Sequence, residues 1–183
     1  MGVMDHSSYG APVHGRQADA ASTVEARTID GARVIALIAV HGDLATPSLE
    51  SVKGALARLA HGSEAAKLLA AAPPPPFASG VAVVLLAGGH AHVATAGGGR
   101  CYRERDGVLH EIGAGAHDLR SGDAVIASSH ASLEVGRRFF TTAVEPSASE
   151  EFRNDTLDDA LESALEGYSS SAFAVAAARI ASS

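Results

Sequence analysis

The chain has 183 residues, enough for one domain with its own hydrophobic core. Its net charge of −7 and its aromatic content of 4% without Trp argue against binding to nucleic acid or to an anionic membrane surface. The apolar runs stay well below the roughly 20 residues of a membrane span, and the N-terminus lacks a secretory signal pattern. The single cysteine, Cys101, excludes an internal disulfide framework and a multi-cysteine metal cluster. We therefore expect a cytoplasmic protein without nucleic-acid or membrane partners.

The N-terminal region predicts a loose arm followed by a single domain. Residues 1–13 mix Gly, Ser, Pro and single charges without periodicity, so we expect an arm there and one domain over residues 14–183. The run Val34–Val40 is continuously apolar and rich in β-branched side chains, which predicts a buried strand.

Two helices are predicted next. Thr46 and Pro47 supply an N-cap and a first-turn proline, and apolar residues then recur at helical spacing, which predicts a helix over Pro47–Ala60. A second helix should begin at Ser63-Glu64 and end before the proline run Pro73–Pro76.

From Gly80 the pattern becomes β. We expect an antiparallel meander separated by glycine turns, with strands over Val81–Ala87, Ala91–Ala96 and Cys101–Arg105. The triple glycine 97–99 lacks the lysine and the following helix of a phosphate-binding loop, so a tight hairpin turn explains it better. Cys101 has no sequence partner for chemistry and is interpreted as a core thiol.

The rest of the chain predicts further short elements. A strand over Val108–Ile112 is followed by a flexible bridge at Gly113–His117 and a strand over Ala124–Ala127. Leu157, Leu161 and Leu165 share one face of a helix over Thr156–Glu166. The segment Phe173–Ile180 is small and apolar, and composition alone fits helix or strand.

Several phrases of the sequence occur in the order in which metal-dependent type-2C (PPM) serine/threonine phosphatases carry similar ones. Residues 93–107, with V-A-T-A-G-G-G-R-C-Y and then R-D-G, resemble the family phrase V-A-x-V-G-D-S-R-x-Y with R-D-G. Residues 119–130, L-R-S-G-D-A-V-I-A-S-S-H, resemble L-x-P-G-D-x-L-L-L-x-S-D-G. Residues 35–45 resemble the strand that runs into D-G-x-x-G-G, and residues 171–180 resemble D-N-I-T-V-V-V-V-R-I.

The resemblance implies an α+β fold, a four-layer αββα sandwich of two antiparallel sheets flanked by helices, in which Phe173–Ile180 is the last strand. It also implies an active site at one end of the sandwich, where aspartates hold two Mg²⁺ or Mn²⁺ ions that activate a water for attack on phosphoserine or phosphothreonine. The segment that forms a mobile flap beside this site in the family is nearly absent between Val108 and Leu119.

The sequence departs from the family at the metal-binding positions. The residues that replace family acidic residues are Ala18, His41, Gly98, His130 and Ser171. Only Asp19 survives among the acidic positions, and His14 stands where the phosphate-holding basic residue is expected. One carboxylate cannot compensate two divalent cations. The departure predicts no Mg²⁺ or Mn²⁺ cofactor and no turnover of phosphopeptides with these ions.

Two functional classes follow from the replacements. The first is a pseudophosphatase that acts as a binding or regulatory module in phospho-signalling, with a Ser/Thr kinase or a phosphoprotein as partner. The second is a phosphoester hydrolase with a rebuilt site, in which His41, His130 and Asp19, or Asp43 in its place, bind Zn²⁺ or another transition metal. The simpler interpretation is that the histidines only fill the vacated pocket. In either case His41 and His130 should lie within contact distance of each other.

Overall fold

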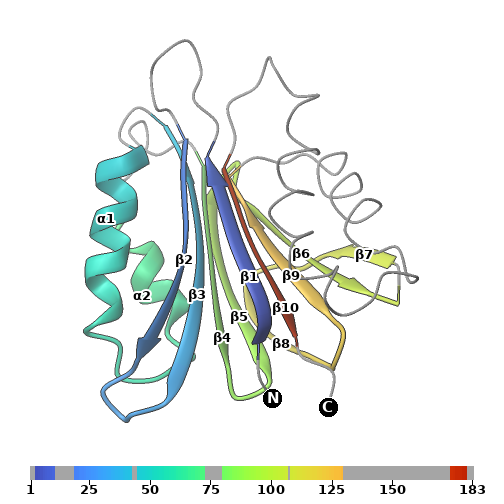
Figure 1. Cartoon of the computed structure of the whole chain (residues 1–183). Helices are drawn as coiled ribbons and strands as arrows, with labels where there is room; N and C mark the ends of the chain where they lie inside the picture. Colours follow the sequence, from blue (N-terminus) through green and yellow to red (C-terminus); the bar gives the residue numbers. More distant parts are fainter. Residues whose placement is uncertain are drawn as a thin grey trace.

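The computed structural model describes residues 3–10, 19–42, 45–72, 80–106, 108–129 and 174–180. Within these residues the chain forms two five-stranded sheets that face each other, and two helices cover the outer face of one of them (Figure 1). Every neighbouring pair of strands is antiparallel. The two antiparallel sheets predicted from the sequence are confirmed.

The strands divide between a helix-covered sheet and a second sheet. The helix-covered sheet has the order β2 (Asp19–Arg27), β3 (Arg33–His41), β4 (Gly80–Ala87), β5 (His90–Gly97) and β8 (Gly115–Asp118). The second sheet has the order β1 (Val3–Gly10), β10 (Ala174–Ile180), β9 (Ala124–Ser128), β6 (Arg100–Arg105) and β7 (Val108–Glu111).

Both predicted helices are present with shifted bounds. Helix α1 spans Ala45–Leu56 and α2 spans Ala65–Leu69. The first begins before Pro47 because the Ala45 amide already donates to the Gly42 carbonyl at 3.1 Å. It ends before the predicted Ala60 because the next amides bond to carbonyls three residues back, which tightens the chain into turns.

Two apolar layers explain the continuous hydrophobic run in β3. Ile38 and Val40 pack with the helices, whereas Leu37 and Ala39, on the other face, pack in the layer between the two sheets. A strand covered on both faces has no polar side to show, so its sequence reads as an unbroken apolar segment.

The C-terminal strand is confirmed against its helix propensity. All seven residues of β10 are buried, and the strand pairs with β1 on one side and β9 on the other. Alternate residues from Ala174 to Ile180 enter the layer between the sheets. Tertiary pairing therefore outweighs the intrinsic preference of alanine for helix.

Three strands, β1, β2 and β8, were not expected from the sequence. The predicted loose arm is wrong for residues 3–10, because β1 pairs with β10 from Val3↔Ile180 to Gly10↔Ala174. The predicted flexible bridge at Gly113–His117 is also wrong from Gly115 onward, because β8 pairs with β5 there. Main-chain pairing needs no apolar periodicity, which is the signal that both segments lack.

The predicted meander is wrong at its last step. β4 and β5 are neighbours, but β5 and β6 belong to different sheets. The triple glycine is therefore a crossing between sheets and not a hairpin turn. Its first residue, Gly97, has a φ of +57°, a backbone conformation that residues other than glycine rarely adopt.

Some expectations lie outside the described residues. They include the helix over Thr156–Glu166 and with it a helix layer on the second sheet. The loss of the flap and the single domain over residues 14–183 stay predictions. Neither helix in the described part of the chain is long and apolar enough to cross a membrane.

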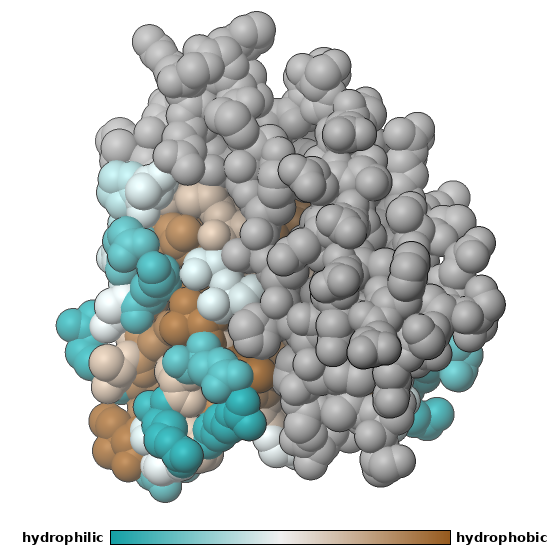
Figure 2. Space-filling model, viewed as in Figure 1, coloured by the Kyte–Doolittle hydropathy of each residue, from teal (hydrophilic) through white to brown (hydrophobic). Residues whose placement is uncertain are grey.

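The surface of the helix-covered half mixes hydrophilic and apolar side chains (Figure 2). Among the described residues, the exposed large hydrophobic side chains are Ile29 and Val108. Single exposed apolar side chains are ordinary on protein surfaces, so they indicate no docking site.

Candidate functional site

The candidate site residues of the helix-covered sheet meet at one end of the sandwich. Asp19, the first residue of β2, is the register partner of His41, the last residue of β3. The same line of paired residues continues across the sheet, because His41 on β3 pairs with Gly80 on β4, and Gly80 pairs with Gly97 on β5. Gly98 follows in the crossing to β6 and offers no side-chain ligand. One carboxylate residue and one imidazole residue are thus cross-strand neighbours.

The second sheet ends at the same place. Ser129 follows β9, and its backbone amide donates to the Ala174 carbonyl at 2.9 Å, while the Ala174 amide donates to the Ser129 Oγ at 2.8 Å. His130 is the next residue after Ser129 in the sequence, and Ser171 precedes β10. Both lie outside the described residues, as do Asp43 and His14, so their predicted roles stay predictions.

The donors in the described part do not fit a pair of hard cations. Two Mg²⁺ or Mn²⁺ ions require several oxygen ligands, and Asp19 is the one acidic residue among the paired strand-end positions Asp19, His41, Gly80 and Gly97. Across the ranges that the structure describes, no group of three or more His, Cys, Asp or Glu side chains is arranged to hold a metal. We therefore derive no step through a two-metal centre.

Some residues of the family-like phrases stabilise the fold away from the candidate site. Arg105, of the R-D-G phrase, forms a two-point ion pair with Asp123, with Nε–Oδ1 at 2.8 Å and Nη2–Oδ2 at 2.6 Å. The Asp123 Oδ2 also accepts from the Arg120 amide at 2.8 Å. This joins β6 to the turn before β9. Asp106, next to Arg105, has a φ of +54° in the turn to β7.

Arg100, retained from the G-D-S-R phrase, contacts the backbone of the crossing. Its Nη1 donates to the carbonyl oxygens of Gly97 at 3.2 Å and Gly99 at 2.8 Å, and its Nε lies 3.2 Å from the Glu111 Oε1. These contacts give the arginine a structural role. It holds the glycine crossing beside the candidate site.

The prediction for Cys101 is also confirmed. The side chain is fully buried between the sheets. Burial raises the pKa of its thiol far above the ordinary range, and the nearby charge of Glu111 adds to this effect. The thiolate, which is the reactive form of cysteine, is suppressed.

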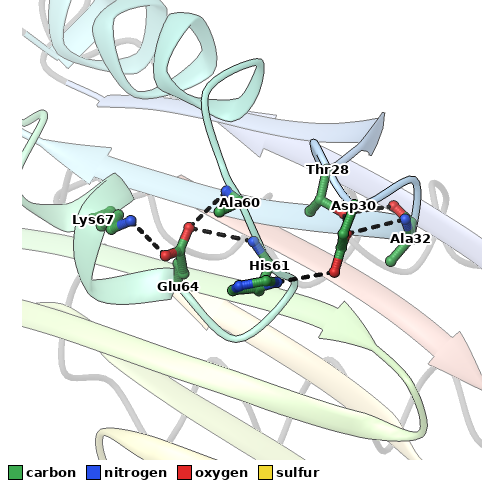
Figure 3. A network of polar contacts seen from close by, with 7 residues as sticks. All are labelled: Thr28, Asp30, Ala32, Ala60, His61, Glu64 and Lys67. Atoms are coloured by element: carbon green, nitrogen blue, oxygen red, sulfur yellow. Dashed lines mark hydrogen bonds and ion pairs between the residues drawn. The ribbon is translucent and has the colours of Figure 1, made fainter.

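A polar network that sequence reasoning missed lies at the opposite end of β2 and β3 (Figure 3). The Asp30 Oδ2 lies 3.0 Å from the His61 Nδ1, and Asp30 also accepts from the Thr28 hydroxyl and the Ala32 amide. The hydrogen bond from His61, followed by those from Thr28 and Ala32, lowers the Asp30 pKa to about 2. Backbone bonds from Ile29 to Leu59 and from Asp30 to Ala60 accompany it. The network joins the β2–β3 turn to the α1–α2 connection.

Comparisons with known proteins identify the fold. No family model and no curated protein sequence matches the chain. Among solved structures, the S. agalactiae serine/threonine phosphatase is similar with a TM-score of 0.69 and 12% identity, over 96% of this chain and 99% of that chain. Another similar structure is the phosphatase domain of the Bacillus subtilis cell-fate determinant SpoIIE with a fragment of its regulatory domain. Its TM-score is 0.67 and its sequence identity 12%, over 97% of this chain and 63% of that chain.

A third similar structure is the catalytic domain of the phosphatase PstP in complex with two manganese ions, with a TM-score of 0.61 and 18% identity over 98% of this chain and 99% of that one. The chain therefore has the fold of type-2C (PPM) serine/threonine phosphatases, as its sequence motifs predicted. The expectation of no cofactor is corrected by this comparison. That expectation considered only the replaced carboxylates, whereas a solved structure of this fold holds two manganese ions.

Proposed function

We propose that the chain is a type-2C phosphatase-like domain that acts as a binding or regulatory module in phospho-signalling and does not hydrolyse phosphopeptides by the two-metal route. The observation that carries this proposal is the contrast between retained and replaced motif residues. Arg105 and Asp123 remain and pair with each other away from the site, whereas His41 and Gly98 replace family aspartates at the site end. This contrast supports a chain in which residues that serve the fold remain while the family aspartates at positions 41 and 98 are replaced.

Electrostatics support the absence of two-metal chemistry. A pair of divalent cations brings four positive charges, and Asp19 is the one acidic residue among the described paired positions Asp19, His41, Gly80 and Gly97. Uncompensated charge that is removed from water is unfavourable by several kcal/mol per ion.

The register of Asp19 with His41 favours a second candidate function. An imidazole and a carboxylate on neighbouring strands form part of a ligand set suited to Zn²⁺ or another late transition ion. With His130 as a further ligand, the chain would be a phosphoester hydrolase with a single-metal site. Zn²⁺ at such a site would supply Lewis-acid activation of a bound water.

The partner in the first function is a Ser/Thr kinase or a phosphoprotein, and the place of action is the cytoplasm. Proteins with this fold include the cell-fate determinant SpoIIE, which has a regulatory domain, and a protein whose structure is described with the bacterial stressosome, a modular system adapted to control secondary messenger signalling. These descriptions belong to those proteins and support a signalling role here. The single cysteine is consistent with a reducing compartment.

Phosphate release from phosphoserine and phosphothreonine peptides tests the proposal. We expect no turnover above the buffer rate with Mg²⁺ or Mn²⁺. Turnover that requires Mn²⁺ and is lost in Asp19→Asn, but kept in the exposed control variant Asp118→Asn, would overturn it. The second candidate predicts turnover with Zn²⁺ that is lost in His41→Gln and kept in His110→Gln, a control at an exposed position on β7.

Co-purification from the native cell tests the partner. A Ser/Thr kinase or phosphoprotein should bind the tagged full chain, and the phosphoprotein should be lost when the lysate is dephosphorylated first. Recovery of neither class above a tag-only control contradicts the partner proposal without affecting the prediction on hydrolysis.

A further inference from the structure

The β2–β3 turn is tied by main-chain and side-chain hydrogen bonds. The Thr28 amide donates to the Ala32 carbonyl at 3.0 Å, and the Gly31 amide donates to the Thr28 carbonyl at 2.9 Å. The Thr28 hydroxyl donates to the Asp30 carboxylate, which also accepts from the Ala32 amide at 3.3 Å. Thr28 is buried, so the base of the turn belongs to the packed interior. The turn therefore has one defined conformation.

The tip of the turn is also bound to the α1–α2 connection (Figure 3). The Ile29 amide donates to the Leu59 carbonyl at 2.8 Å, and the Asp30 Oδ2 lies 3.0 Å from the His61 Nδ1. On the connection, the Glu64 carboxylate accepts from the His61 amide at 3.4 Å. Two segments that are far apart in the sequence thus fix the backbone of Ile29.

The side chain of Ile29 extends from this fixed backbone and is 74% exposed. Exposure alone is ordinary for a single apolar side chain. The relevant feature is the fixed position, because a group that is already ordered loses less conformational entropy when it binds. Ile29 is therefore suited to contact a partner if the groups around it can recognise one.

Two arginines beside this turn have no acidic partner. The Arg27 Nη1 donates to the Gly31 carbonyl at 3.2 Å, which places its guanidinium on the turn. Arg58 is exposed and directly precedes Leu59, whose carbonyl accepts from the Ile29 amide. Within the described ranges, neither arginine forms an ion pair.

The acidic side chains of the two joined segments already have basic partners. In residues 25–33 and 58–67, the pairs are Glu25–Arg33, Asp30–His61 and Glu64–Lys67. Arg27 is also the register partner of Arg33, and like charges directly opposite each other on neighbouring strands are unfavourable. The turn thus keeps two unpaired guanidinium groups on a chain of net charge −7. This arrangement is complementary to an anionic ligand.

We propose that Ile29, Arg27 and Arg58, which we call the turn surface, bind a phosphorylated segment of a partner protein. A phosphate monoester carries about 1.5–2 negative charges and three acceptor oxygens, and guanidinium groups bind it through charge-assisted hydrogen bonds. An apolar residue beside the phosphoserine or phosphothreonine packs on Ile29. The inference rests on the proposed function, in which the partner is a phosphoprotein. The turn surface lies at the opposite end of β2 and β3 from Asp19 and His41, so this phosphate binds away from the candidate site.

Binding of the full chain to phosphopeptides tests the turn surface. The probe is an array of fluorescent peptides with one fixed phosphoserine and varied neighbours, and anisotropy is measured without added metal. We expect the strongest binding from peptides that carry an apolar residue near the phosphoserine. Ile29→Ala, Arg27→Gln and Arg58→Gln should each weaken this binding by at least about fivefold, a loss that is common when a central contact of an interface is truncated.

Matched controls come from exposed side chains elsewhere. Val108→Ala removes the other large exposed apolar side chain of the described residues, which is 52% exposed on β7 of the second sheet. Arg120→Gln removes an exposed arginine in the turn before β9. Both controls should bind the peptides like the wild type. Each variant is compared at a temperature at which circular dichroism shows it folded.

Three results would overturn the inference. They are no binding of any phosphopeptide by the wild type, equal binding of peptides with serine or glutamate in place of phosphoserine, and variants of the turn surface that bind as well as the two controls. Turnover of the bound phosphopeptides with Mn²⁺ would instead contradict the proposed function and leave the turn surface in place. The two failures are therefore distinguishable.

Discussion

Replacement of Asp123 by alanine should remove the partner of a nearly buried guanidinium. The Arg105 side chain is 18% exposed and that of Asp123 is 2% exposed. Their ion pair has two hydrogen bonds, at 2.8 and 2.6 Å, and the Arg120 amide donates a third to Asp123 at 2.8 Å. Asp123→Ala therefore leaves one cation and one amide without their acceptor.

The expected loss of stability is about 3 kcal/mol, because breaking a buried ion pair costs about 3–5 kcal/mol. We use the lower end because the Arg105 Nη2 keeps its hydrogen bond to the Asp118 carbonyl at 3.0 Å and retains some contact with water. For a domain of 150–250 residues, this loss corresponds to a fall in Tm of roughly 6–12 °C.

The stability difference should depend on pH. Burial alone would raise the pKa of Asp123, but the hydrogen bonds from Arg105 and the Arg120 amide and the charge of Arg105 outweigh it, so the pKa lies below its ordinary value. The unfolded chain therefore takes up the proton first as the pH falls. The stabilisation is fully present above the unfolded pKa of about 4 and is lost as the pH drops through the folded value.

Urea unfolding measures both the loss of stability and its pH dependence. The wild type and Asp123→Ala are compared from about pH 7 down to pH 3, a range that brackets the unfolded carboxyl pKa. The pair Arg33–Glu25 is the control, since its 2.7 Å distance is similar but its side chains are 58% and 48% exposed. Glu25→Ala should cost about 0–1 kcal/mol. Equal losses for Asp123→Ala and Glu25→Ala at pH 7, or an Asp123→Ala loss that is constant with pH, would refute this reasoning.

Three further predictions concern titratable groups. Cys101 should react with a thiol reagent only after unfolding, because burial raises its pKa, and rapid labelling of the native chain would contradict this. Burial, and then the charge of His90, lowers the pKa of His92, so the folded state loses stability as the pH falls below the unfolded value of about 6.5. His92→Gln should flatten that loss, and an NMR titration of His92 at or above the unfolded value would disprove the cause. The Asp30 pKa of about 2, lowered chiefly by the hydrogen bond with His61, predicts a loss of stability as the pH falls from about 4 toward 2. An Asp30→Asn variant that loses as much stability as the wild type over this pH range would contradict this prediction.

Local patterns in the sequence were enough to locate several elements. The β3 strand was predicted because burial on both faces leaves an unbroken apolar run. The α1 helix was predicted because burial on one face leaves a helical period, and both patterns can be recognised within a few residues. The motif phrases predicted the fold and directed attention to Asp19 and His41, whose register the structure provides. The side chains that replace family aspartates were visible in the sequence alone.

Only the tertiary structure decided which distant segments pair. β1 has no apolar period, and it becomes a strand because β10, at the other end of the chain, offers it main-chain hydrogen bonds. The same pairing turns an alanine-rich segment into β10. The contact of Gly80 with Ser129 leaves no trace in either local sequence, because it depends on how closely two sheets approach. Spacing along the chain reports local geometry, whereas register and close approach depend on partners far away in the sequence.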